Sequence, residues 1–205
     1  MSEFPHLKFS SKQEVREFVW KRIEPYSLFP PPYGRIPNFK GAFRACERLR
    51  DLEEWKNARV VFSAPDSPLR RAREICLEDG KILVMAKPHI RGFLIFNPVL
   101  NACSFRAGTV RGTLKELMSL GTEIELKDLP EVDIFVQGCV AVDLRGNRIG
   151  KGKGYGDREY HMLKPKLYVV VCHDLQVFDD LSYLCDEHDA RCDVILTPKR
   201  VIRCE

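Results

Sequence analysis

Residues 60–85 read VVFSAPDSPLRRAREICLEDGKILVM, and this stretch decides the fold. Its two apolar runs, at 59–63 and 81–86, have the length and the content of buried strands. Between them, Ser67-Pro68 begins a helix, because proline is favoured in a first turn, and Asp79-Gly80 ends it. A strand, a helix and a strand in this order make a β–α–β unit, which predicts a parallel sheet.

The elements around this unit extend it to an α/β fold. Upstream, residues 11–23 predict a helix that Ser10 or Ser11 caps, with Glu14 placed as in a capping box, and residues 41–55 predict a second helix. Downstream, residues 113–120 predict a short helix. Further strands are expected at 132–142 (broken at Gln137-Gly138), 167–172 and 194–197. We therefore expect an open, mostly parallel sheet with helices on both faces.

A length of 205 residues suits one hydrophobic core. We expect a single domain over residues 1–205, with a helical N-terminal part at about 10–56 and the sheet core at about 58–205. The segment 26–37 holds four prolines in twelve residues, which excludes regular structure and favours a connector on the surface.

Composition excludes several classes of protein. The chain is 44% hydrophobic and 30% charged, which is an ordinary globular balance. A formal charge of +4 is well below the clustered basic excess of nucleic-acid binders, so nucleic acid is not an expected partner. The apolar runs are far shorter than the ~20 residues of a membrane helix, and residues 1–6 do not resemble an export signal. The expected location is the cytoplasm.

The cysteines favour core packing over a metal site or a disulfide framework. Cys76, Cys139 and Cys172 lie in apolar runs, where cysteine acts as a small hydrophobe. The sequence has no Cys-x-x-Cys pair, the short spacing that zinc sites normally show. The sequence leaves open whether one or two disulfide bonds form. The eight positions are Cys46, Cys76, Cys103, Cys139, Cys172, Cys185, Cys192 and Cys204.

The segment 143–157, DLRGNRIGKGKGYGD, carries the chemistry. Glycine lets backbone N–H groups approach a ligand closely, and successive N–H groups in such a turn form a concave anion site. The intervening lysines add positive charge, and a helix starting near Asp157 would add its positive end. The alternating residues are Gly150, Lys151, Gly152, Lys153, Gly154, Tyr155 and Gly156. The pattern predicts a binding site for the phosphates of a nucleotide.

This segment matches neither of the common nucleotide motifs. It lacks the Gly-x-x-x-x-Gly-Lys-Ser/Thr pattern, and it is not a dinucleotide fingerprint, because it does not follow the first strand. A flexible basic loop is the competing interpretation, which four glycines at two-residue spacing disfavour. Because open parallel sheets bind ligands outside the carboxyl ends of their strands, two further polar segments, 63–66 and His173-Asp174, are candidates.

The glycine-rich segment closely resembles the nucleotide loop of 5-formyltetrahydrofolate cyclo-ligases, also called methenyltetrahydrofolate synthetases. That family's pattern is Arg-Leu-Gly-x-Gly-x-Gly-Tyr-Tyr-Asp. Lys12 and Arg16 resemble its Lys-x-x-x-Arg on the first helix, and residues 187–197 resemble its His-Asp-x-x-x-Asp segment ahead of the last strand. Residues 35–41 and 193–202 are similar to the branch of methenyltetrahydrofolate synthetase domain-containing proteins. The resemblance spans nearly the whole chain and implies a cyclo-ligase, or NagB-like, sheet.

The resemblance implies an enzyme that uses ATP and Mg²⁺ to close 5-formyltetrahydrofolate into 5,10-methenyltetrahydrofolate through a phosphorylated formyl group. It implies a catalytic role for Lys153 and Arg148 in stabilising the transferring phosphoryl. Asp157 and Asp189 match the magnesium carboxylates, and Asp66, Phe62 and Tyr155 the folate contacts. The implied nucleotide contacts are Lys12, Arg16, Arg148, Gly150, Lys151, Gly152, Lys153, Gly154, Tyr155 and Gly156.

These residues also have simpler interpretations. Lys12 and Arg16 lie four apart and share a helix face, which could be merely solvated. Asp157 could cap the following helix, and Asp189 could be a turn aspartate. His173 and Asp174 are adjacent on an extended chain and point opposite ways, so we expect a capping role and not a catalytic pair.

Two departures from the family pattern keep alternatives open. Gly156 stands where the family has a second tyrosine, and Asp66 must serve where the family has a glutamate that holds the pterin. The chain could therefore be a nucleotide-binding protein that has lost cyclisation and acts through partners or RNA, or an enzyme for another formyl or amide substrate. Lys87, His89 and Arg91 could receive a glutamate tail or be solvated. We expect a monomer or a homodimer.

Overall fold

The computed structural model describes residues 7–98 and 113–205, and within them the strands form two sheets. The larger sheet has eight strands. In spatial order they are β11 (Val201–Arg203), β10 (Val194–Leu196), β8 (Leu167–Val171), β5 (Ile134–Gly138), β1 (Val60–Ser63), β2 (Ile82–Ala86), β3 (Phe93–Phe96) and β4 (Thr122–Ile124). The smaller sheet consists of β7 (Arg148–Ile149), β6 (Ala141–Asp143) and β9 (Val177–Phe178).

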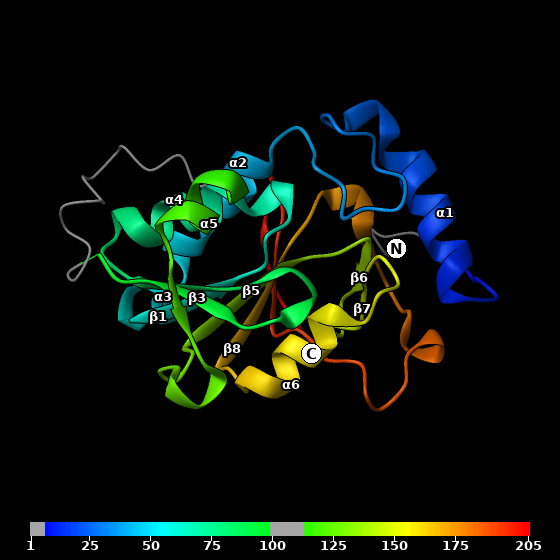
Figure 1. The fold of residues 1–205 in the computed structure, drawn as a ribbon. Helices are drawn as coiled ribbons and strands as arrows, with labels where there is room; N and C mark the ends of the chain where they lie inside the picture. The colour runs from blue at the N-terminus through cyan, green and yellow to red at the C-terminus, as the bar shows by residue number, and fades with distance from the viewer. Residues whose placement is uncertain (1–6, 99–112) are drawn as a thin grey trace.

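The helices surround the larger sheet. The α-helices are α1 (Lys12–Ile23), α2 (Ala42–Glu47), α3 (Glu53–Asn57), α4 (Arg70–Glu78), α5 (Leu114–Leu120) and α6 (Tyr155–Leu163). Short 3-10 helices are η1 (Glu24–Tyr26), η2 (Arg48–Asp51), η3 (Ser67–Leu69), η4 (Pro88–Ile90), η5 (Leu126–Asp128), η6 (Asp174–Gln176) and η7 (Ser182–Leu184). Figure 1 shows α2 and α4 on one side of the sheet and α6 on the other, the two-faced α/β arrangement that the sequence predicted.

The β–α–β unit at 60–86 forms as predicted. β1 and β2 pair in parallel, with Val61 opposite Leu83, and Gly80 after α4 has φ +70°, the left-handed conformation that ends a helix. β5, β8 and β10 continue the parallel order on the other side of β1. Chain connections therefore leave β1 and β5 in opposite directions, which makes their carboxyl ends a topological switch point.

The edges of the large sheet were not predicted. β3 and β4 pair antiparallel beyond β2, and β11 pairs antiparallel with β10. Antiparallel strands at the edges of a parallel sheet are common. These strands have three or four residues each, too short for a periodic signal.

Two predicted elements are divided. The helix expected at 41–55 breaks at Leu52, whose extended backbone separates η2 from α3 and lets both Leu52 and Trp55 reach the core. The run at 132–142 divides after Gly138, where the chain leaves the large sheet for the small one. A Cβ on Gly138 would lie 2.5 Å from Cγ2 of Ile36, so only glycine fits this close approach.

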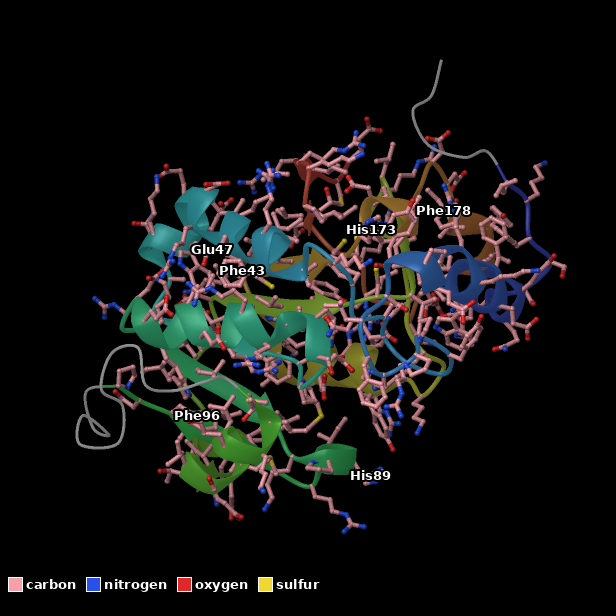
Figure 2. The ribbon with its side chains drawn as sticks, turned by 90° about the horizontal axis from the view of Figure 1, so that it is seen from above. Phe43, Glu47, His89, Phe96, His173 and Phe178 are labelled. Atoms are coloured by element: carbon pink, nitrogen blue, oxygen red, sulfur yellow. The ribbon has the colours of Figure 1, made fainter. Side chains whose placement is uncertain are left out.

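Two clusters of buried side chains hold the layers together. The main core lies between the large sheet and its helices, and Cys76, Cys139 and Cys172 are fully buried in it, as expected. A smaller cluster joins α1 to the small sheet and includes Val15 and Val19 of α1. It also includes Phe178 of β9, which Figure 2 labels. The predicted helix cap is present, since Ser11 Oγ accepts a hydrogen bond from the Glu14 backbone. Cys103 and residues 1–6 lie outside the described residues.

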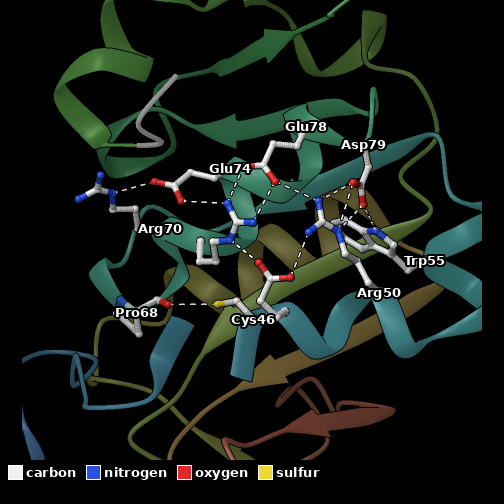
Figure 3. A network of polar contacts seen from close by, with 10 residues as sticks. Cys46, Arg50, Trp55, Pro68, Arg70, Glu74, Glu78 and Asp79 are labelled. Carbon is white, nitrogen blue, oxygen red and sulfur yellow. Dashed lines mark hydrogen bonds and ion pairs between the residues drawn. The ribbon is translucent and has the colours of Figure 1, made fainter. Parts of the chain in front are cut away.

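A network of ion pairs joins α2 and its following turn to α4 (Figure 3). Arg50 contacts Glu47 at 3.0 Å, Glu78 at 3.0 Å and Asp79 at 2.6 Å. Arg71 bridges Glu47 and Glu78 from the other side. Arg50 and Arg71 therefore each have at least two carboxylate partners.

Candidate functional site

A cavity of about 420 Å³ opens at the carboxyl edge of β1, β2 and β5. It therefore lies at the switch point, where open α/β sheets bind ligands. The segment after β1 forms one wall of the cavity, the turn after β2 forms a second, and the glycine-rich segment forms a third. The lining includes Lys12, Arg16, residues 64–66 and 86–90, Gln137, residues 148–157, Glu159 and Asp189. Sequence positions that are far apart, on α1 and near the C-terminus, thus meet in one place.

The glycine-rich segment forms a tight turn between β7 and α6. Gly152 has φ +96° and Gly154 has φ +65°, and Gly154 is the residue that precedes the first turn of α6. Helix α6 begins at Tyr155, two residues earlier than expected, so Asp157 lies inside its first turn and is not its cap. Glycine backbone and the N-terminus of α6 therefore border the cavity, and a helix N-terminus favours an anion.

Five cations predicted from the sequence border this turn, and they have few acidic partners. Arg16 Nε donates to the Gly150 carbonyl at 2.8 Å, and burial lowers the pKa of Arg16. Arg148 is buried and its Nε donates to the Gly138 carbonyl at 2.9 Å. The ammonium group of Lys153 has no hydrogen bond or ion pair with any residue that the structure describes.

The remaining two cations pair with carboxylates, and Lys12 also has a second, longer contact with Asp186 at 3.9 Å. Lys12 contacts Asp189 at 2.5 Å, and Lys151 contacts Asp66 at 3.1 Å. Burial alone would lower the pKa of Lys12, but the hydrogen bond and the charge of Asp189 raise it. Each of these two ammonium groups lies beside an acid that was predicted to bind metal or substrate.

Asp157 and Asp189 suit a magnesium ion. Both line the cavity, and Asp157 Oδ1 accepts a hydrogen bond from the backbone of Ala190, which ties the two segments together. The described residues contain no group of three or more acidic, histidine or cysteine side chains that would hold a metal alone. Mg²⁺ needs only one or two carboxylates when it also binds phosphates and water, so this donor set fits it.

Tyr155 and Phe62, both predicted to contact substrate, have different surroundings. Tyr155 lines the cavity, and its hydroxyl lies 2.7 Å from Nδ1 of His89, on the turn that follows β2. Phe62 is fully buried and stacks on Phe135 with ring centroids 4.6 Å apart. Phe62 does not line the cavity, because the strand directs its side chain into the core, so its predicted role is corrected to a packing one.

The segment after β8 does not belong to the cavity. His173 Nδ1 accepts from the backbone of Leu175, and Gln176 completes the capping box, which is the structural role expected for this histidine. Figure 2 shows His173 well apart from His89. Lys87, one of the residues considered for a glutamate tail, pairs with Glu123 on β4.

Two cavity residues were missed by the sequence analysis. Gln137 is the next-to-last residue of β5, and Glu159 lies one turn along α6 from Tyr155. Their side chains meet, with Gln137 Nε2 at 3.2 Å from Glu159 Oε2. Burial, together with the nearby charge of Asp66, raises the pKa of Glu159 to about 7. The spacing of four residues from Tyr155 places Glu159 on the cavity side of the helix, and this is the signal that could have found it.

Comparison with known families identifies the chain. The model of the 5-formyltetrahydrofolate cyclo-ligase family matches residues 9–198, which includes both the first helix and the C-terminal acidic segment. The chain belongs to this family. None of the described helices has both the length and the apolar character that crossing a membrane requires.

Named relatives place this cyclo-ligase family member more closely. It is 39% identical, over 94% of its length, to a methenyltetrahydrofolate synthase domain-containing protein of Bos taurus, of which it covers 53%. The chain thus spans about half the length of that relative. The NMR structure of Aquifex aeolicus 5,10-methenyltetrahydrofolate synthetase is 25% identical, with a TM-score of 0.62 over 94% of this chain and 92% of the other. A Mycoplasma pneumoniae synthetase shares the fold, at 14% identity and a TM-score of 0.57 over 91% and 98%.

Proposed function

We propose that this protein is a cyclo-ligase that uses ATP to convert 5-formyltetrahydrofolate into 5,10-methenyltetrahydrofolate. The observation that carries the proposal is the cavity at the switch point, where a glycine turn, five cations and the carboxylates of Asp157 and Asp189 converge. A triphosphate needs N–H donors and cations, and Mg²⁺ needs the carboxylates, so one cavity offers what the magnesium nucleotide requires.

The glycine turn would hold the nucleotide phosphates. The backbone N–H groups at Gly152 and Gly154 would contact phosphate oxygens, with Lys12 and Arg16 on the α1 side. Lys153, which has no acidic partner among the described residues, would stabilise charge on the γ-phosphoryl as it moves to the formyl oxygen. Arg148 would contribute mainly by packing against the glycine turn, because Gly150 lies next to its guanidinium group.

Asp157 and Asp189 would hold Mg²⁺, which neutralises phosphate charge when it is bound. For this, Asp189 would exchange Lys12 for the cation, and Lys12 would turn to the phosphates. Both changes are local, since the two side chains already line the same cavity.

The folate would lie between the glycine turn and the segment after β1. Tyr155 offers a ring face on this side of the cavity, and Lys151 holds Asp66 at its border. In the reaction, the formyl oxygen takes the γ-phosphoryl group and ADP leaves. N10 then attacks the formyl carbon, phosphate leaves with the oxygen, and the N10 proton passes to water. Because ATP and reduced folates are metabolites of the cell interior, we propose the cytoplasm as the location.

Purified protein with Mg-ATP and 5-formyltetrahydrofolate tests the proposal. We expect the absorbance of the methenyl product to appear, with ADP and phosphate released in equal amounts. ATP binding without any product would favour the second candidate, a nucleotide-binding member without cyclisation, which the glycine at 156 and the pairing of Asp66 with Lys151 also suggest.

A further inference from the structure

The floor of the cavity holds a carboxyl group that the proposed reaction has not yet used. Glu159 is 6% exposed, yet it borders the cavity. Gln137 Nε2 donates to its Oε2 at 3.2 Å. Among the described residues Oε1 has no hydrogen-bond partner, and it is not sealed away from open space. One oxygen of Glu159 is therefore held in place while the other faces the ligand space.

Gln137 is fixed by its own hydrogen bonds. Its Oε1 accepts from the Tyr168 hydroxyl at 2.8 Å, and its Nε2 donates to the Gly156 carbonyl at 3.3 Å as well as to Glu159. Both polar atoms of the amide are thus occupied, which fixes its orientation. A chain from Tyr168 through Gln137 to Glu159 holds the carboxyl before any ligand arrives.

Gly156 makes room for this pair. A Cβ at position 156 would lie 2.8 Å from Gln137 Oε1 and 2.9 Å from its Nε2, so a side chain at 156 and the Gln137 amide exclude each other. The missing side chain at 156 is therefore compensated by an amide and a carboxyl that line the same part of the cavity.

The other carboxylates of the cavity are already engaged. Asp66 pairs with Lys151, Asp189 with Lys12, and Asp157 accepts from the Ala190 backbone. A folate ring presents a 2-amino group next to an N3–H, and a carboxylate satisfies two such parallel donors well. Within the proposed function, we infer that Glu159, positioned by Gln137, binds the amino-pyrimidinone edge of the reduced folate.

A substrate analogue and one isosteric variant test this role. The analogue is 5-formyltetrahydrofolate with the 2-amino group replaced by methyl, and the variant is Glu159→Gln, which keeps the shape of the side chain. We expect either change alone to raise KM for the folate about 10- to 100-fold, since a donor or acceptor loses a charge-assisted partner. KM for ATP should stay within twofold, and Glu125→Gln, at an exposed site, is the matched control.

The combination of both changes decides the matter. If Glu159 contacts the 2-amino group, the Glu159→Gln variant should have nearly the same KM for the analogue as for 5-formyltetrahydrofolate, because the contact is already lost in the variant. The inference would be overturned if the increases in KM from the variant and from the analogue multiplied in full, or if the wild type had the same KM for both folates. The cyclo-ligase proposal would stand in either case. A wild type that binds ATP but no folate would overturn both. The analogue on wild-type protein is informative even if the variant does not fold.

Discussion

Three cations of the cavity, Arg16, Arg148 and Lys153, have surroundings opposite to those of the arginines between α2 and α4. Arg50 and Arg71 each contact at least two carboxylates (Figure 3). In the cavity, Arg16 and Arg148 donate to backbone carbonyls, and Lys153 has no acidic partner in the described part of the chain. The same residue types therefore neutralise charge within the protein in one region and leave it for a ligand in the other.

The comparison predicts that a cavity cation matters for chemistry and not for folding. Lys153→Ala should lower turnover by about 10²- to 10³-fold, because one charge on the transferring phosphoryl is lost. The melting temperature should not fall, since no described partner is left unpaired. The measurement is the methenyl-forming assay beside thermal unfolding, with Lys127→Ala, 75% exposed, as the control. Turnover equal to that of the control would contradict the assignment.

The arginine network should behave in the reverse way. Arg71→Met removes the cation between Glu47 and Glu78 while keeping the aliphatic stem, so we expect unfolding free energy to fall by about 1–2 kcal/mol. Turnover at 25 °C should be unchanged. Denaturant titration measures the loss, and Arg203→Met, whose pair with Glu54 is more exposed, should change stability by less than about 0.5 kcal/mol. A loss of activity in folded Arg71→Met would break the comparison.

The glycine turn should be sensitive to a single methyl group. At Gly152, with φ +96°, alanine is strained, and its Cβ would lie 3.3 Å from Cζ of Arg16. We expect Gly152→Ala to weaken nucleotide binding about tenfold, which equals about 1.4 kcal/mol. Gly34→Ala is the matched control, because Gly34 also has positive φ but no atom within 4 Å. Calorimetric titration with Mg-ATP should show the weakening only for Gly152→Ala.

Low pH should reduce the stability that the arginine network contributes, and this is the smallest of the expected effects. The hydrogen bond with Arg71 lowers the pKa of Glu78. Burial alone would raise the pKa of Asp79, but its hydrogen bonds with Arg50 and Trp55 and the charge of Arg50 lower it. A carboxyl with a lowered folded-state pKa stabilises the fold above its unfolded-state pKa, and this contribution disappears as the pH falls through the folded-state value. Arg71→Met should therefore lose less stability than wild type when the pH is lowered below about 4. Equal acid sensitivity would mean that these pairs contribute nothing.

Local signals allowed much of this molecule to be predicted from its sequence. Ser11 caps α1, Gly80 ends α4, and the glycines at 152 and 154 adopt the positive φ that their pattern required. Each of these depends on neighbours in the chain. The family resemblance then supplied Lys12 and Asp189, which the fold brings together although 177 positions separate them.

Features that depend on packing could not be predicted. The orientation of Phe62 into the core, the small sheet of β6, β7 and β9, and the meeting of Gln137 with Glu159 follow from how distant elements pack. The short edge strands have too few residues to show a period. The folate side of the cavity is formed by such contacts, so it was the less predictable half of the site.

The most direct test of the account is a crystal structure of the protein with Mg²⁺ and a non-hydrolysable ATP analogue. The account predicts phosphate oxygens within hydrogen-bond distance of the backbone N–H groups around Gly152 and Gly154, the Lys153 ammonium at the γ-phosphate, and Mg²⁺ beside Asp157 and Asp189. A nucleotide bound at another place on the molecule, with the glycine turn free of phosphate, would contradict it.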